Sequence, residues 1–335
     1  MIQTLRYLQK NLIWTIPTFM IFGLLYGKFF DVSSFKALIL PLTFFMVYPM
    51  MVSLKMNFHF SKKCRKVLLL TQGLNFLVIP FLGLFIGKMF FADKPFAVVG
   101  LLLTSLLPTS GMTISWTGFA KGNMLAAVKI TVFGLILGSV LTPFYLDWLV
   151  GESIVIPLVQ VFKQIALIVF APMLLGLFTQ KILVKKYGQK SFDETYKKKF
   201  PPFAIIGVLG IVFIAMALKS SAILNNPALL WQYFLPLIVL YAVNFALSTI
   251  VGKTFLSRED AIALVYGTVM RNLSIALAIA MTVFGKESSE IAIIIALAYV
   301  IQAQSAAWYV KFTDIIFGKE SILHKIKRIL FKESS

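Results

Sequence analysis

The sequence has few of the residue types on which enzymes and metal sites depend. Its 335 residues include one cysteine, Cys64, and two histidines, His59 and His324. A single cysteine cannot form an intrachain disulfide, and these three side chains are too few for a metal-ligand cluster. The 13 acidic residues fall in loops or at the ends of apolar segments, so no nucleophile and base are paired within those segments. We therefore expect no enzyme, no resident metal and no organic cofactor.

Apolar residues dominate the chain, at 59% of the total. They gather into ten segments, each close to the roughly 20 residues that a helix needs to cross a bilayer. The first segment is long, lacks a small-residue cleavage site and is followed by nine more, so it does not read as a signal peptide. The pattern predicts an all-α polytopic membrane protein with ten transmembrane helices. They cover residues 12–29, 35–54, 67–90, 96–119, 124–149, 161–183, 203–218, 229–256, 261–284 and 291–312.

The chain has a net charge of +19, and its lysines and arginines are distributed unevenly between the loops. Alternate loops and the two termini carry 23 of the 32 lysines and arginines, the opposite loops carry six, and three lie within apolar segments. Positively charged loops stay in the cytoplasm, so we predict an inner-membrane protein with both termini cytoplasmic and no nucleic-acid partner. The basic loops would face anionic lipid headgroups. The tail 318–335 is predicted to form an amphipathic helix on them, or else to bind a partner.

Similar motifs recur in the same order in the two halves of the chain. Asn75-Phe76 in the third segment matches Asn244-Phe245 in the eighth, and Gly-Lys follows each pair. We predict two five-helix repeats, residues 1–153 and 154–317, followed by the tail. Because five is an odd number, the second repeat must be inverted in the membrane. Inverted repeats place the substrate near the midplane, at interrupted helices.

Two interruptions stand at equivalent positions of the fourth and ninth segments. Residues 107–111 read Leu-Pro-Thr-Ser-Gly, where proline removes a backbone donor and glycine loosens the helix. Residues 271–274 read Arg-Asn-Leu-Ser. Pro108 and Leu273 each stand eleven residues before the end of their segment, at Phe119 and Phe284. The two interruptions are therefore predicted to meet near the middle of the membrane.

Arg271 lies in the middle of the ninth segment, where a charge costs at least ~2.5 kcal/mol. No acidic residue stands at that depth to balance it. We expect its planar fork of donors to pair with a small anionic substrate, beside the capped ends of the half-helices. Alternatively, it bonds the carbonyls of the other interrupted helix and only holds the crossing together. The predicted substrate-binding residues are Arg271, Asn272, Ser274, Pro108, Thr109, Ser110, Gln72, Asn75 and Asn244.

The other polar side chains within the segments have two interpretations each. The amides Gln72, Asn75 and Asn244 either line the cavity or link helices, and Gln302 is interpreted chiefly as such a link. Hydroxyl side chains either bind a coupling ion or bond the carbonyls of their own helix. The possible ion site comprises Thr113, Ser115 and Thr131. Sodium and the proton both stay open as the coupling ion.

Three stretches of the chain resemble one known family. They are residues 46–55, residues 100–112 with 120–122, and residues 272–280. Together with the ten-helix pattern they are similar to the bile acid:sodium symporter superfamily, and most similar to its arsenite/antimonite efflux permease branch. The resemblance implies a panel domain of helices 1, 2, 6 and 7 beside a core domain of helices 3–5 and 8–10, in which broken helices 4 and 9 cross. It also implies secondary transport by alternating access.

Two residues depart from the efflux permease branch. Thr109 stands where that branch has a cysteine, and Asn272 where it has a glutamate. A hydroxyl does not supply the soft ligand that arsenite requires. We therefore expect a secondary-active transporter of a small or organic anion, with Arg271 as the counter-charge. The alternatives are a metalloid efflux permease with a changed ligand set and a membrane receptor or scaffold that does not transport. Substrate identity, direction and oligomeric state stay open.

Overall fold

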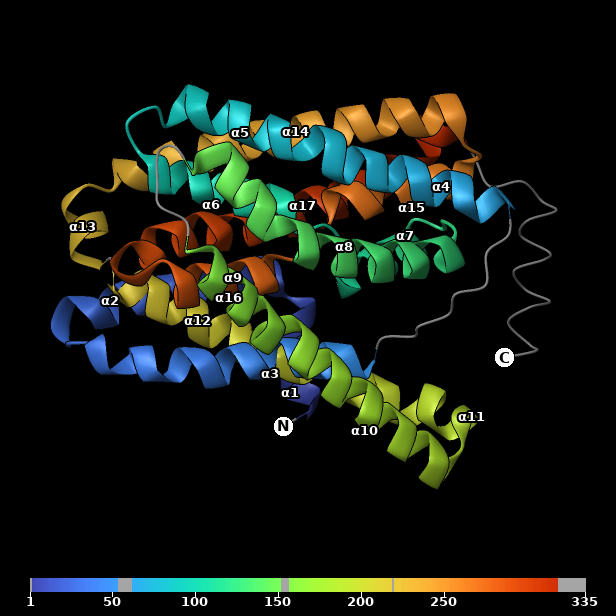
Figure 1. Cartoon of the computed structure of the whole chain (residues 1–335), viewed down its shortest axis with the longest axis horizontal. Helices are drawn as coiled ribbons and strands as arrows, with labels where there is room; N and C mark the ends of the chain where they lie inside the picture. Colours follow the sequence, from blue (N-terminus) through green and yellow to red (C-terminus); the bar gives the residue numbers. More distant parts are fainter. Residues whose placement is uncertain (1, 54–61, 152–156, 219, 319–335) are drawn as a thin grey trace.

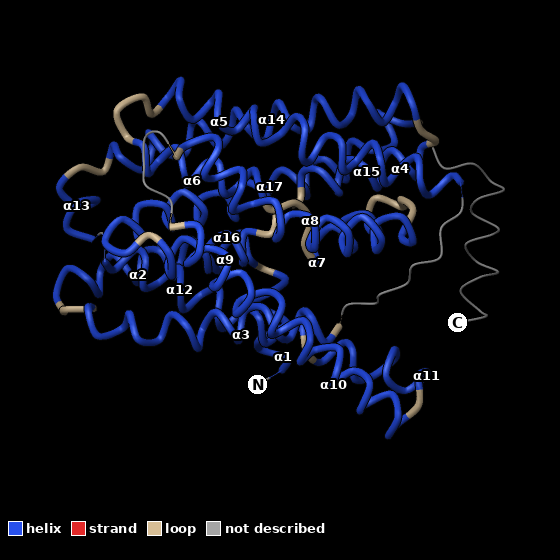
Figure 2. The backbone as a smooth tube through the Cα atoms, viewed as in Figure 1, coloured by secondary structure: helices blue, strands red, loops and turns tan. Residues whose placement is uncertain are grey.

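The computed structural model describes residues 2–53, 62–151, 157–218 and 220–318, and these residues are almost entirely helical (Figures 1 and 2). No β-strand occurs among them, and the prediction of an all-α chain is confirmed. The predicted amphipathic helix of the basic tail lies outside the described residues, apart from Gly318.

The first half of the chain forms helices whose ends follow the apolar segments closely. The π-helix η2 continues directly from α4 into α5, so the three form one long rod. The elements are α1 (Ile2–Lys10), α2 (Leu12–Phe29), η1 (Ser33–Leu38), α3 (Ile39–Val52), α4 (Lys62–Gly73), η2 (Leu74–Val78), α5 (Ile79–Phe90), α6 (Pro95–Leu106), α7 (Gly111–Phe119) and α8 (Met124–Val150).

The second half begins with another rod interrupted by a π-helix. It consists of α9 (Leu158–Ile165), η3 (Ala166–Phe170) and α10 (Ala171–Tyr187), and short turns follow it. The remaining elements are α11 (Gln189–Ser191), η4 (Phe192–Tyr196), η5 (Lys197–Lys199), η6 (Pro201–Phe203), α12 (Ala204–Leu218), α13 (Ser220–Asn225), α14 (Ala228–Phe255), α15 (Arg258–Val269), α16 (Leu273–Val283), η7 (Gly285–Glu287) and α17 (Ser288–Phe317).

Among the described residues, five helices are long and apolar enough to cross a membrane. They are Arg65–Phe90, Met124–Val150, Gln189–Leu218, Leu230–Phe255 and Gly285–Phe317. Two shorter apolar helices, α6 and α16, each stop or start at an interruption. This pattern is that of a polytopic membrane protein. The count of ten spans and the inverted repeat stay predictions.

The helices form two groups with α17 between them. On one side α2 and α3 both pack on α12, and α10 packs on α3. On the other side α5 packs against α6 and α14, and α14 packs against α15. The helix α17 contacts α2 and α12 of the first group and α6, α14 and α16 on its other side. Figure 1 shows α2 and α3 along one edge of the molecule and α5 and α14 along the opposite edge.

The close approach of α2 and α12 depends on two glycines one turn apart. A Cβ atom at Gly23 would lie 2.5 Å from the carbonyl oxygen of Phe213, and one at Gly27 would lie 2.2 Å from that of Ala217. Small residues spaced by four let helix backbones touch within a membrane, where van der Waals contact drives helix association. The Gly-x-x-x-Gly spacing in α2 thus explains how this pair packs.

Candidate functional site

The two interruptions predicted from the sequence are present, and they lie against each other. Helix α6 ends at Leu106 and α7 begins at Gly111; α15 ends at Val269 and α16 begins at Leu273. Pro108 and Arg271 form an antiparallel β-bridge between the two breaks. The backbone N–H of Asn272 donates to the carbonyl of Leu107 at 2.8 Å. Four helix ends therefore converge on one short stretch of paired, extended backbone.

Side chains from the breaks cap the helices that follow. The hydroxyl of Ser110 accepts from the N–H of Met112 at 3.2 Å, and that of Thr113 accepts from the N–H of Ser110 at 3.2 Å, which completes a capping box. At α16, Oδ1 of Asn272 accepts from the N–H of Ile275 at 3.3 Å. Ser110 and Asn272 are therefore the N-cap residues of α7 and α16. The positive ends of the α7 and α16 helix dipoles therefore lie at the breaks.

Thr109 fastens the first break to α8. Its hydroxyl lies 2.7 Å from the carbonyl oxygen of Pro108 and 3.1 Å from that of Thr131. Its φ of 65° is in the left-handed region, which costs a β-branched residue on the order of 1–3 kcal/mol. Thr109 packs against Gly134 of α8. A side chain there would clash, because a Cβ at Gly134 would lie 2.7 Å from the Thr109 hydroxyl. Thr109 therefore bonds protein carbonyls at the break.

Arg271 is buried, with 2% of its surface exposed. Its guanidinium nitrogens Nη1 and Nη2 are both buried, and neither has a hydrogen-bond partner among the described residues. Asp260, a buried carboxylate in the first turn of α15, accepts hydrogen bonds from Asn123 and Ser257. It is therefore engaged with other partners than Arg271. A charge removed from water without a partner is strongly unfavourable. The site is therefore suited to an anion that supplies the missing acceptors.

The backbone of Arg271 is fully bonded although its side chain is not. Its N–H donates to Oε1 of Gln302 at 2.7 Å, and its carbonyl accepts from Nε2 of Gln302 at 3.3 Å. The hydroxyl of Tyr241 donates to the same Oε1 at 2.9 Å. The expected link through Gln302 is confirmed. The alternative in which Arg271 bonds the carbonyls of the other broken helix is not supported, because Nη1 and Nη2 make no such bond among the described residues.

Ser274 lies on the first turn of α16 and is paired with α17. Its hydroxyl is 2.6 Å from the hydroxyl of Tyr299, and either oxygen can be the donor. Both side chains are buried. The neighbourhood of Arg271 therefore includes two phenols that our sequence reasoning missed, Tyr241 and Tyr299. Tyrosine in an apolar segment is a weak signal, because it is also common in ordinary packing and at membrane interfaces.

The two asparagines of the repeat motif both bond the last turn of α15. Nδ2 of Asn75 donates to the carbonyl of Gly267 at 3.0 Å, and Nδ2 of Asn244 donates to that of Thr268 at 3.2 Å. Carbonyls in the last turn of a helix have no partner within that helix. Asn75 and Asn244 thus link helices and cap α15 just before the break. Asn75 lies in the π-helix η2, a kind of helix that often marks functional sites.

Two buried side-chain oxygens near these contacts have no hydrogen-bond partner among the described residues. They are Oδ1 of Asn75 and Oε1 of Gln72. Nε2 of Gln72 donates to the carbonyl of Ile130 in α8 at 3.3 Å, so Gln72 also links helices. All three amides predicted for the substrate site are therefore engaged through their nitrogens.

The three hydroxyls of the possible ion site do not share one surface. Thr113 and Thr131 are buried, whereas Ser115 is exposed. Residues two apart on a helix point in different directions, which separates Ser115 from Thr113. The hydroxyl of Thr131 donates to the carbonyl of Ala127 at 2.8 Å, within its own helix. The described residues also contain no cluster of three or more metal-ligating side chains.

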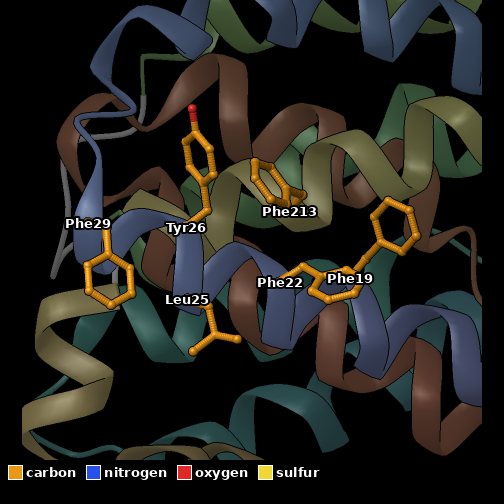
Figure 3. A pocket seen from close by; sticks show the side chains of 6 residues that line it. All are labelled: Phe19, Phe22, Leu25, Tyr26, Phe29 and Phe213. Carbon is orange, nitrogen blue, oxygen red and sulfur yellow. The ribbon is translucent and has the colours of Figure 1, made fainter.

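A separate hollow of about 450 Å³ lies between α2 and α12 (Figure 3). It is lined by Phe19, Phe22, Leu25, Tyr26, Phe29 and Phe213. The lining is apolar and includes none of the predicted site residues. Phe22 and Phe29 are exposed at 56% and 70%, as expected of side chains that face lipid. This hollow does not have the chemistry to bind an anion.

Comparison with known proteins agrees with the resemblance drawn from the sequence. A profile of the Sodium Bile acid symporter family matches residues 40–226. An uncharacterized transporter of Synechocystis is 24% identical over 320 residues, which cover 85% of this chain and 83% of that protein. The arsenical-resistance protein Acr3 of Alkaliphilus metalliredigens is 27% identical over 200 residues, 56% of each chain. Sodium/bile acid cotransporter 7 of Xenopus tropicalis is 24% identical over 195 residues, 55% of this chain and 54% of its own.

Proposed function

Because this chain belongs to the sodium bile acid symporter family and is a membrane transporter, we propose that it carries a small or organic anion by secondary-active, alternating-access transport. Arg271 is the counter-charge of the substrate. One observation carries the proposal: the guanidinium nitrogens Nη1 and Nη2 of Arg271 are buried and have no partner among the described residues.

The chemistry around Arg271 favours an oxyanion such as a carboxylate. A guanidinium presents a planar fork that matches two oxygens at once, and a charged hydrogen bond is about twice as strong as a neutral one. The half-helices α7 and α16 begin at the same breaks, and their dipoles favour negative charge there. The hydroxyls of Ser274 and Tyr299 bond each other at the start of α16, which leaves one O–H of the pair as a further donor.

We also propose the ten-span, inverted-repeat topology as the frame for this transport. The equivalent positions of the two breaks support it, as do the paired Asn-Phe motifs. The panel is then α2, α3, α9–α10 and α12, and the remaining membrane helices form the core. The loop charges favour cytoplasmic termini in an inner membrane, with anionic headgroups against the basic loops.

Metalloid efflux is the second candidate, because arsenical-resistance proteins are among the relatives. In this reading the ligand set has changed, since Thr109 and Asn272 stand where the efflux permease branch has cysteine and glutamate. A hydroxyl and an amide are hard ligands and bind arsenite poorly. The buried cation at Arg271 also favours an anion over uncharged arsenite.

A ligand screen with the purified protein tests the proposal. Acetate, inorganic phosphate, taurocholate and arsenite are each tested for a rise in melting temperature, with sodium and with choline as the cation. A ligand that binds the folded form raises its apparent stability by mass action. We expect anions to raise it and arsenite to have no effect. Saturable uptake of the same anion into proteoliposomes separates a transporter from a receptor or scaffold, which would bind without uptake.

A further inference from the structure

The side chain of Gln302 contacts Arg271 in an unusual way, because both of its polar ends bond one residue's backbone. Gln302 lies in α17 and is fully buried. Its Oε1 accepts from the N–H of Arg271 at 2.7 Å, and its Nε2 donates to the carbonyl of Arg271 at 3.3 Å. A side-chain amide carries the same donor and acceptor as a peptide group. Gln302 therefore pairs with Arg271 as a neighbouring β-strand would.

This pairing completes a small piece of sheet around the break. The N–H of Asn272 donates in another direction, to Leu107, and Pro108 stands opposite Arg271 in the antiparallel bridge. In extended backbone the polar groups of successive residues alternate between the two sides of the strand. Arg271 thus lies between a real strand partner and an amide that substitutes for one. Side chains of a paired strand project out of its plane, so both contacts determine where the guanidinium points.

Tyr241 holds the Gln302 amide in place, and the peptide groups of Arg271 set the orientation of that amide. The hydroxyl of Tyr241 donates to the same Oε1 at 2.9 Å, so this oxygen receives two hydrogen bonds. The reversed amide would place Nε2 against the N–H of Arg271, donor against donor. Tyr241 belongs to α14 and Gln302 to α17. Two helices outside the second break, α14 and α17, therefore hold the backbone of Arg271 in its position.

We propose that Gln302, held by Tyr241, is the positioning residue for Arg271. Its amide keeps the backbone of residue 271 extended and directs the guanidinium toward the bound anion. The proposal rests on the proposed function for its effect on binding, but its effect on the backbone does not depend on the substrate. The lengths and burial of the three hydrogen bonds support it.

The first experiment measures the backbone directly. Hydrogen–deuterium exchange is followed in peptides that cover residues 268–274, for the whole protein in detergent and without ligand. Gln302→Leu removes both bonds to Arg271, and we expect faster exchange in these peptides. The matched control is Gln304→Leu on the same helix, because Gln304 is only half-buried and points in a different direction. Exchange in Gln302→Leu that equals the wild type would overturn the proposal.

The second experiment separates positioning from stability. It uses whichever of acetate, inorganic phosphate and taurocholate binds the wild type, and measures affinity between pH 8 and pH 5. Gln302→Leu should weaken binding roughly ten-fold, as expected for one or more buried hydrogen bonds. In Gln302→Glu, the carboxylate formed at pH 8 cannot donate to the carbonyl of Arg271, and its charge competes with the substrate for the guanidinium. Position 302 is fully buried, and burial raises the pKa of a carboxyl. As the pH falls toward 5, the protonated acid restores a donor and an acceptor, so affinity should recover relative to the wild type.

The outcomes of the two experiments are distinguishable. Among the described residues, the titratable ones that hydrogen-bond the Gln302 side chain are Arg271, through its backbone, and Tyr241 of α14. Tyr299 of α17 lies close enough to Tyr241 to interact with it electrostatically. The melting temperature of Gln302→Glu could change with pH while its affinity relative to the wild type stays constant. That result would show that Gln302 has only a structural role. If no anion binds the wild type, the proposed function fails, and the exchange experiment still decides whether Gln302 positions Arg271. If Gln302→Leu does not fold, Gln302→Glu supplies both readouts at pH 5 and pH 8.

Discussion

The backbone N–H of Asn272 donates to the carbonyl of Leu107 across the two breaks, at 2.8 Å. Leu107 follows the last residue of α6, and Asn272 precedes the first residue of α16. The free carbonyl at the end of one helix is therefore satisfied by the free N–H at the start of another. Non-helical backbone is tolerated at membrane depth where protein buries it. The contact explains how two broken helices can stay ordered without water.

We predict that Gly138→Ala destabilises the protein by roughly 1–3 kcal/mol, the usual effect of overpacking. A Cβ at Gly138 would lie 2.8 Å from Cδ of Pro108, and a proline ring held in the break cannot rotate away. The control is Gly73→Ala, because a Cβ at Gly73 has nothing within 4 Å. The control should gain up to about 1 kcal/mol from helix propensity. Melting of both variants in detergent is the measurement, and equal melting temperatures would contradict the prediction.

The helix ends and the two breaks could be predicted because their signals are local. Pro108 cannot continue a hydrogen-bonded helix, and Arg271 cannot face lipid without a large cost. Both facts are visible in the sequence, and the structure interrupts α6 and α15 at these points. The observed span of α2, Leu12–Phe29, equals the predicted segment for the same reason. The ends of such a helix can be predicted from the first and last residues of its apolar segment.

The partners of the buried amides could not be predicted in the same way. Gln302 and Arg271 are far apart in the sequence, and nothing local indicates that one would bond the backbone of the other. Asn75 lies in a π-helix, which has no sequence signature of its own. The ion site of Thr113, Ser115 and Thr131 stays a prediction, although two of its members lie on different sides of one helix. Residues two positions apart on a helix point in different directions, and Ser115 is exposed whereas Thr113 is buried.

The topology prediction concerns the two sides of the membrane. A reporter fused at Asn226, between α13 and α14, should lie outside the cytoplasm, and one fused at Ser335 should lie inside it. The physical reason is the concentration of lysine and arginine in one set of loops. Alkaline phosphatase and green fluorescent protein fusions report the two sides. Signals from the same side at both positions would rule out the ten-span topology.

We predict that expression of this protein gives a cell little resistance to arsenite. Expression in an arsenite-sensitive host should raise resistance no further than the Arg271→Gln variant does, because Thr109 is a hard ligand. Growth in graded arsenite is the measurement. Resistance that persists in Cys64→Ser would show that a thiol is not needed, and would favour the metalloid candidate. Thr109→Cys tests the converse by adding a thiol at the break.

The coupling prediction is that anion binding does not strictly require sodium. The carboxylates lie in loops or at the ends of the predicted spans, and the hydroxyl of Thr131 bonds within its own helix. Affinity for the best anion should change less than about ten-fold when choline replaces sodium. Thr131→Ala should leave that affinity near the wild type. A steep sodium dependence that is lost in Thr131→Ala would instead identify Thr131 as an ion ligand.

The central prediction concerns Arg271 and separates two roles for it. Arg271→Lys keeps a charge but loses the fork of donors, so anion affinity should fall. Arg271→Gln removes the charge, and the loss should be roughly 2–5 kcal/mol if the pair is desolvated. Lys163→Gln is the control, because it removes a charge from an exposed position of α9. Its affinity should equal that of the wild type.

The melting temperature without ligand completes this test, because the two roles predict opposite signs. Nη1 and Nη2 of Arg271 have no partner among the described residues, so the charge costs free energy in the empty protein. Removing it in Arg271→Gln should leave the melting temperature unchanged or raise it while binding is lost. If Arg271 only held the helix crossing together, the melting temperature would fall and the surviving protein would bind normally. Both quantities are measured on the same preparations, and unchanged affinity in Arg271→Gln would remove the case for an anion at the breaks.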